Sequence, residues 1–191
     1  MDIWVAFTSL VLGTALAATC GVRTFLPLFA LGIAARAGLV DLGEAFTWLE
    51  GAPALLALGT GVVLELLSDK VPWLSSALDV LKAPARAAAG MVALAATVVD
   101  LPLWIVALVA IIVGGGVALS VHVARSGVRL AAAAKSAGAL APVLSIVEDV
   151  VVAAVIVLSI AFVSVAAVVA FAGVFIAWQA YRAIRARRRR A

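Results

Sequence analysis

The chain is a succession of long apolar runs separated by short charged segments. A helix needs about 20 apolar residues to cross the hydrocarbon core of a bilayer, with a range of about 17–25. Residues 3–20 and 103–121 have this length, and the final apolar tract, 137–178, is long enough for two crossings. With 66% hydrophobic and 13% charged residues, the chain is also too apolar for a water-soluble domain. We therefore expect an all-α polytopic membrane protein.

Shorter apolar segments complete the predicted bundle, and they lie at 24–40, 53–67 and 87–99. The final tract is expected to turn near residues 159–164. Segment 70–86 carries its charges on one side and Trp73 with several leucines on another, as an interfacial amphipathic helix would. The expected fold is a bundle of about six to seven transmembrane or re-entrant helices plus this interfacial helix.

The distribution of Lys and Arg predicts the orientation of the chain. The single helical domain, residues 1–181, is followed by an arginine-rich tail, residues 182–191, which the positive-inside rule places in the cytoplasm. Seven spans with an external N-terminus satisfy this rule at nearly every loop. If one short segment is re-entrant, the total is six and the N-terminus lies inside. The first apolar run lacks the basic start of a signal peptide, so we interpret it as a retained span.

Two short stretches repeat the pattern Ala-x-x-Gly-Val-Arg: "ATCGVR" at 18–23 and "ARSGVR" at 124–129. Both follow a long apolar span, but a chain rich in Ala and Val also produces such a match by chance. If the match is a true internal repeat, seven spans make the two halves parallel, and one re-entrant segment makes them inverted, as in many transporters.

Charged and polar side chains gather toward the cytoplasmic ends of the predicted spans. Two trios have the spacing i, i+3, i+4, which places each on one helix face: Glu65, Ser68 and Asp69, and Ser145, Glu148 and Asp149. A polar stripe continues the predicted span at residues 103–121, and its members are His122, Arg125, Ser126 and Arg129.

Such charges need partners, because a charge within a span costs roughly 2.5–3.5 kcal/mol on insertion scales. The simplest arrangement sets two arginines against four acids: Arg23 and Arg129 against Glu65, Asp69, Glu148 and Asp149. We predict that these six form a binding site or ion pathway, with Ser68, His122, Arg125 and Ser145 as secondary members. The alternative is that the ion pairs only hold helices together.

Several functions have no support in the sequence. The single cysteine, Cys20, cannot form an internal disulfide, and the single histidine, His122, fits no metal-ligand spacing. Since no nucleotide loop or nucleophile motif occurs either, we expect no metal, no cofactor and no catalytic residue. The surplus positive charge lies in the tail, where membrane topology explains it better than nucleic-acid binding.

Several motifs in order resemble a family of small bacterial integral membrane proteins, the domain-of-unknown-function family numbered 4126. They are "CGVRTFLPLFALGIAARAG" (20–38), "ELLSDKVPWLSSALDVLKAPARAAAG" (65–90), "GGG" (114–116), "HVARSGVR" (122–129) and "SAGALAPVLSIVEDV" (136–150). The resemblance implies a polytopic protein of the inner membrane with no assigned activity. Family members commonly have a proline between the last two spans. This chain has none after Pro142, which leaves one long tilted helix as an alternative to the predicted turn.

Three functional hypotheses follow. The first is a small transporter or channel-like carrier, in which the acids serve a cation or proton, or the arginines bind an anionic substrate. The second is a membrane scaffold that assembles with itself, for instance as a dimer, or with a partner. The third and weakest is an enzyme acting on lipid head groups. Membrane lipids are the expected partners in each, and the basic tail adds about 1 kcal/mol of attraction to anionic lipid per residue.

Overall fold

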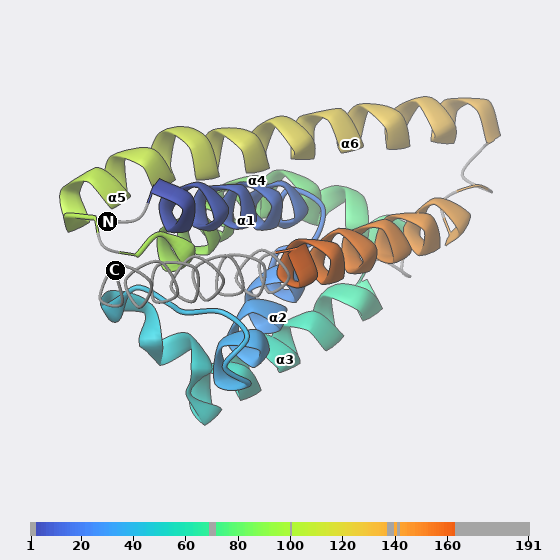
Figure 1. Cartoon of the computed structure of the whole chain (residues 1–191). Helices are drawn as coiled ribbons and strands as arrows, with labels where there is room; N and C mark the ends of the chain where they lie inside the picture. The colour runs from blue at the N-terminus through green and yellow to red at the C-terminus, as the bar shows by residue number, and fades with distance from the viewer. Residues whose placement is uncertain (1–2, 69–71, 100, 137–139, 141, 163–191) are drawn as a thin grey trace, which may run out of the picture.

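The computed structural model describes residues 3–68, 72–99, 101–136, 140 and 142–162, and every regular element in them is helical (Figure 1). In chain order these elements are α1 (Ile3–Cys20), α2 (Phe25–Arg36), η1 (Glu44–Glu50), α3 (Ala52–Ser68), α4 (Pro72–Thr97), α5 (Leu103–Val109), η2 (Ala110–Gly115) and α6 (Gly116–Ser136). A further helix, Pro142–Phe162, follows and is called the C-terminal helix below.

Two of these helices are long and apolar enough to cross a membrane: Leu103–Ala132, which unites α5, η2 and most of α6, and the C-terminal helix. The pair η1 and α3 counts as a third if its 64° bend is taken within one span. α1 and α2 are apolar but shorter. The chain therefore has membrane-type helices, and the predicted six to seven spans are not confirmed by length and composition.

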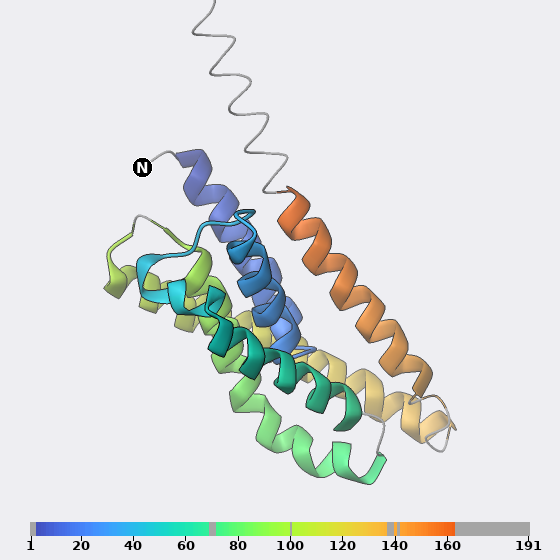
Figure 2. The same cartoon turned by 90° about the horizontal axis from the view of Figure 1, so that it is seen from below.

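The prediction for residues 70–99 differs from the structure. A separate interfacial helix and a span were expected there, but α4 runs from Pro72 to Thr97 as one helix with Pro84 inside it. A proline interrupts the helical hydrogen-bond ladder and bends a helix, and α4 does change direction along its length (Figure 2). The side chains of α4 before Lys82 lie outside the described part of the structure. The prediction that Trp73 and the leucines lie on the opposite side of the helix from the charges is therefore untested.

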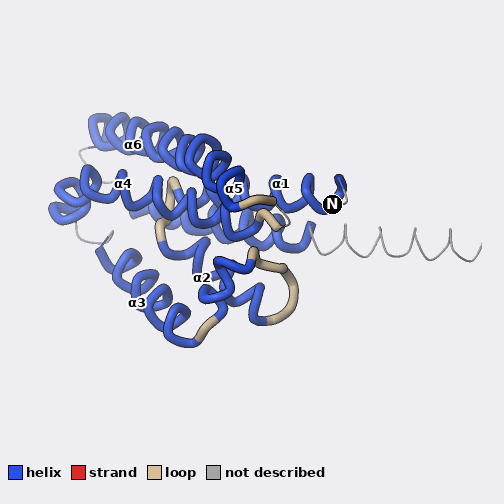
Figure 3. The backbone as a smooth tube through the Cα atoms, turned by 90° about the vertical axis from the view of Figure 1, so that its left-hand side faces the viewer, coloured by secondary structure: helices blue, strands red, loops and turns tan. Residues whose placement is uncertain are grey.

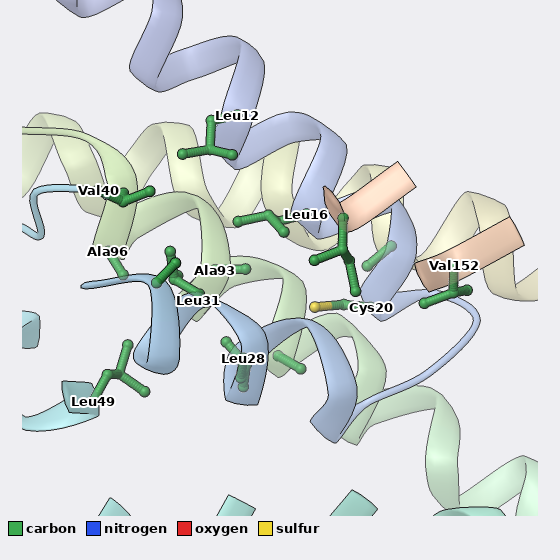
Figure 4. Packing of buried hydrophobic residues seen from close by; sticks show 14 residues of the cluster. Leu12, Leu16, Cys20, Leu28, Leu31, Val40, Leu49, Ala93, Ala96 and Val152 are labelled. Atoms are coloured by element: carbon green, nitrogen blue, oxygen red, sulfur yellow. The ribbon is translucent and has the colours of Figure 1, made fainter. Parts of the chain in front are cut away.

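The core forms where α1 crosses α4, with α2 packed below them (Figure 3). Leu12, Leu16 and Cys20 of α1 lie in one buried cluster with Ala93 of α4 and Leu31 of α2 (Figure 4). Cys20 is a small packing residue in this core, since its side chain is fully buried. α3 lies outside this core, against α2 and η1.

Small residues bring α4 and the segment before α6 into backbone contact. A Cβ added to Gly90 would come within 2.6 Å of the carbonyl oxygen of Gly114, and one added to Gly114 would come as close to the carbonyl of Gly90. The chain is π-helical at this point, from Ala110 to Gly115, which is an arrangement found mostly as single-turn irregularities. Gly114, the first residue of "GGG" at 114–116, therefore permits close packing of the two helices.

The two Gly-Val-Arg copies have different conformations. Gly21 and Arg23 lie in the turn after α1, where a Cβ on Gly21 would overlap the carbonyl oxygen of Ala118. Gly127 and Arg129 lie within α6, and nothing lies within 4 Å of a Cβ on Gly127. The first glycine therefore permits a close helix approach that the second does not make, and local structure gives the repeat no support.

The C-terminal helix lies along the outside of the bundle (Figure 2), and only 11% of its apolar 18-residue stretch is buried. Val152 and Ile156 are its buried apolar side chains among the described residues, and both join the α1 core. The helix continues through Ser159 to Phe162, and the rest of the turn predicted near 159–164 lies outside the described residues.

Candidate functional site

The predicted ionic cluster forms at one end of the bundle. The end of α6, the beginning of the C-terminal helix and the end of α3 all lie toward the right of Figure 1, with the C-terminal helix between the other two, and the turn after α1 faces the same way. Charged side chains from these segments meet between the helices, so residues up to 126 positions apart in the sequence come into hydrogen-bond contact. Asp69, one of the predicted members, lies outside the described residues.

Arg23 is placed by the turn that follows α1, and only 1% of it is exposed. Its Nε donates to Oδ1 of Asp149 at 2.7 Å, and its Nη2 contacts the same oxygen. Nη2 also donates to the hydroxyl of Ser145, one turn earlier on the C-terminal helix, at 3.3 Å. The predicted pairing of Arg23 with an acid is therefore confirmed, and the partner is Asp149.

Glu148 receives two arginines of α6. Arg129 binds it through two nitrogens, with Nε 3.1 Å from Oε1 and Nη2 2.8 Å from Oε2. Arg125 donates to the same Oε2 from Nη2 at 2.8 Å. The two arginines are one helical turn apart on the same face of α6, so both can reach a single carboxylate. Arg125, expected as a secondary member, is as close to Glu148 as Arg129 is.

Glu65 has a different role from the one predicted. Its Oε1 accepts from the backbone N–H of Thr24 at 2.8 Å, and its Oε2 accepts from the N–H of Phe25 at 3.2 Å. The first N–H groups of a helix have no partner within it, and they carry a partial positive charge. Glu65 of α3 therefore caps the N-terminus of α2, and its described hydrogen bonds go to the backbone rather than to an arginine.

The polar contacts continue from Glu65 to α4. The hydroxyl of Ser68 donates to the carbonyl oxygen of Glu65 at 3.0 Å, and Nζ of Lys82 donates to the same hydroxyl at 3.4 Å. Ser68 was expected as a secondary member of the site, whereas Lys82 lay in the predicted interfacial helix at residues 70–86.

Arg86 of α4 was also missed. It is 1% exposed, and its Nη1 contacts Nδ1 of His122 on α6. The sequence does carry a signal for this position. Small residues recur at Ala89, Ala93 and Thr97, one helical turn apart on the same face as Arg86, and all three are buried. A charge that continues such a small-residue face belongs to the packed side of a helix.

The cluster is closed in this conformation. Arg23, Arg86 and Arg125 are at most 8% exposed, although long charged side chains are almost never fully buried unless they are paired. Two adjacent carboxylates of the C-terminal helix bind different parts of the bundle: Asp149 binds the turn after α1, and Glu148 binds α6. Within the described part of the chain, no three His, Cys, Asp or Glu side chains gather as a metal site requires.

The fold and the cluster together define an all-helical protein with membrane-type helices joined by buried charges. The chain belongs to the family described as "Domain of unknown function (DUF4126)", whose model matches residues 10–183. The resemblance inferred from the motifs is thereby confirmed. No protein of curated function and no solved structure matches the chain significantly.

Proposed function

We propose that the chain is a multi-pass inner-membrane carrier whose ionic cluster is a gate. The observation that carries this proposal is the position of Glu148 and Asp149. They are neighbours on a helix that has little other burial, and they tie it to two separate parts of the bundle. Breaking both contacts would release this end of the C-terminal helix while leaving the α1–α4 core intact.

The cost of the charges supports a gate over a purely structural role. Buried ion pairs rarely stabilise a protein more than apolar residues of similar size, because both charges must leave water. More apolar contacts like those of Val152 and Ile156 would attach the helix without the free-energy cost of removing charges from water. Charges are preferable where a contact must break and re-form, since each partner is well solvated once water or a substrate enters.

The distribution of charge between the two ends of the bundle supports a cytoplasmic position for the cluster. The loop after α2 and the helix η1 lie at the end of the bundle opposite the cluster (Figure 1) and carry Asp41, Glu44 and Glu50. The cluster end carries the arginines of α6. By the positive-inside rule the cluster faces the cytoplasm, so we propose a gate on the cytoplasmic side.

Flux measurements on the full chain in proteoliposomes test the gate. The probes are protons, chloride and inorganic phosphate, each driven by its own gradient. Glu148→Gln removes a charge-assisted contact worth about 1.5–3 kcal/mol, so we expect the flux of at least one probe to rise about tenfold or more. Glu44→Gln, an exposed change at the opposite end, is the matched control and should leave flux unchanged.

The second candidate is a scaffold, and the closed, paired state of the arginines favours it. In that case wild type and Glu148→Gln both give the flux of empty liposomes for every probe, while the variant unfolds at a lower temperature. This outcome would overturn the gate and leave the ion pairs as structural contacts.

A further inference from the structure

An apolar pocket lies between α1 and the C-terminal helix, away from the ionic cluster. Its volume is about 490 Å³, within the range of about 300–1,000 Å³ typical of small-molecule sites. Its walls are Val11, Leu12, Leu158, Ser159, Ala161 and Phe162. Ser159 is the one polar side chain among them, and its hydroxyl donates to the carbonyl of Val155, so these walls suit a hydrocarbon.

The contact between α1 and the C-terminal helix is called the seam below. The pocket lies at one end of this seam and the ionic cluster lies at the other. α1 and the C-terminal helix run in opposite directions (Figure 1), so Leu12 and Leu158 meet at one end, and Arg23 and Asp149 meet at the other. From Asp149 to Leu158 the helix rises about 14 Å, at about 1.5 Å per residue. One leaflet of the hydrocarbon core has nearly the same depth, about 15 Å of the total of about 30 Å.

Apolar side chains line the seam between its two ends. Leu16 and Cys20 of α1 belong to the same buried cluster as Val152 and Ile156 of the C-terminal helix, and Figure 4 shows Cys20 beside Val152. The seam therefore has an arginine in an ion pair at one end, an apolar wall and an open apolar pocket, and it would match an anionic amphiphile once the Asp149 carboxylate is displaced.

We propose that this seam binds one anionic phospholipid from the leaflet at the cluster end. Its phosphate takes the place of the Asp149 carboxylate on Arg23, and one acyl chain extends along α1 to the pocket. Phosphate suits this exchange because guanidinium binds carboxylate and phosphate with the same paired geometry. The inference rests on the gate proposed above, for which it names an anionic ligand that displaces the Asp149 contact.

Lipid titration of the purified full chain in detergent, followed by native mass spectrometry, tests the site. The probe is phosphatidylglycerol, and phosphatidylcholine, a zwitterion whose choline cation balances its phosphate, is the comparison without net charge. Leu158→Trp fills the pocket, and Val157→Trp is its control, because the two positions are adjacent and similarly exposed, at 67% and 65%. We expect saturable binding of one phosphatidylglycerol. The Kd should rise about tenfold with Leu158→Trp, as loss of a few buried CH2 contacts requires, and less than about twofold with Val157→Trp.

Three results would overturn the site: no saturable binding of phosphatidylglycerol, equal affinity for phosphatidylcholine, or equal effects of the two tryptophans. A fourth is a lower unfolding temperature for Leu158→Trp with unchanged lipid affinity, which would mean that the pocket is filled by protein, either the chain beyond Phe162 or a second copy.

The lipid titration does not depend on flux. Failure here leaves the gate in place for another solute. Retained binding without flux of any probe leaves the lipid site in place and removes the gate.

Discussion

The cap of α2 by Glu65 makes the sharpest prediction about the site, because the sequence and the structure assign this residue different roles. In Glu65→Gln the side chain keeps one acceptor and gains an NH2 group. Two backbone donors, of Thr24 and Phe25, then compete for one oxygen, and the negative charge at the helix N-terminus is lost. The change therefore removes a hydrogen bond and a charge–dipole interaction without changing the size of the side chain.

The expected cost follows from these two contributions. Loss of an N-terminal cap costs about 0.5–2 kcal/mol, and a carboxylate at a helix N-terminus contributes about 0.3–1 kcal/mol on a surface and up to ~2 kcal/mol when partly buried. Glu65 is 7% exposed, so the upper parts of these ranges apply. We expect a loss of about 2–3 kcal/mol. For a chain of this length that lowers the Tm by about 5–10 °C.

The protein carries its own reporter for this measurement. Cys20 is the single cysteine in the chain and is fully buried at the end of α1. A maleimide dye that fluoresces on reaction with a thiol will therefore react on unfolding, and heating the detergent-solubilised protein with it gives the Tm. Glu44→Gln is the control, since an exposed substitution of this kind stays within about 0.5 kcal/mol.

Two results would refute the capping role. One is a Tm for Glu65→Gln equal to that of the control. The other is strong coupling between Glu65→Gln and Arg129→Gln in a double-mutant cycle, which a direct ion pair would produce. Capping predicts that the two changes add within about 0.5 kcal/mol, because the described partners of Glu65 and Arg129 are different.

Further predictions concern the helix contacts and the partners of Arg23, and all use the same thermal assay. Gly90→Ala should destabilise the protein by about 1–3 kcal/mol, because its Cβ meets backbone, whereas Gly127→Ala, with open space around its Cβ, should stabilise α6 by up to about 1 kcal/mol. Equal effects of the two would refute the close packing of α4. Asp149→Asn should cost about 3–5 kcal/mol by removing a carboxylate that pairs with the buried Arg23. Ser145→Ala should cost less than about 1.5 kcal/mol, because its contact with Arg23 is long and the hydroxyl carries no charge; similar losses for the two would contradict the assignment of the ion pair to Asp149.

The helical class and much of the cluster's membership could be predicted from the sequence. The class depends on the length of the apolar runs, and the membership depends on how deep in the membrane each charged residue lies. Span-length apolar runs place the ends of successive helices at the same level. Arg23 and Asp149, 126 positions apart, could therefore be assigned to one site. The bounds of α1, Ile3–Cys20, coincide with those of the first predicted run.

The pairing within the cluster could not be predicted, because it depends on how each helix is rotated and on where neighbouring elements begin. Glu65 was grouped with the acids expected to face Arg23 and Arg129, but the turn after α1 brings the start of α2 against Glu65 instead. Arg86 was missed because residues 70–86 were interpreted as a separate interfacial helix, and a helix that continues through Pro84 is a tertiary outcome. The packing of its buried face outweighs the lost hydrogen bond.

Packing also identifies the part of the molecule that is able to move. α4 touches η2 through the backbone of Gly90 and Gly114, and such contacts have no slack, because side chains that could adjust are absent. The C-terminal helix has the opposite character, with few buried side chains, an open pocket near Leu158 and ionic contacts around Glu148. Elements with few buried apolar contacts open at the lowest free energy. A substrate route is therefore expected along the seam between α1 and the C-terminal helix, and the α4–η2 contact should stay fixed as the gate opens.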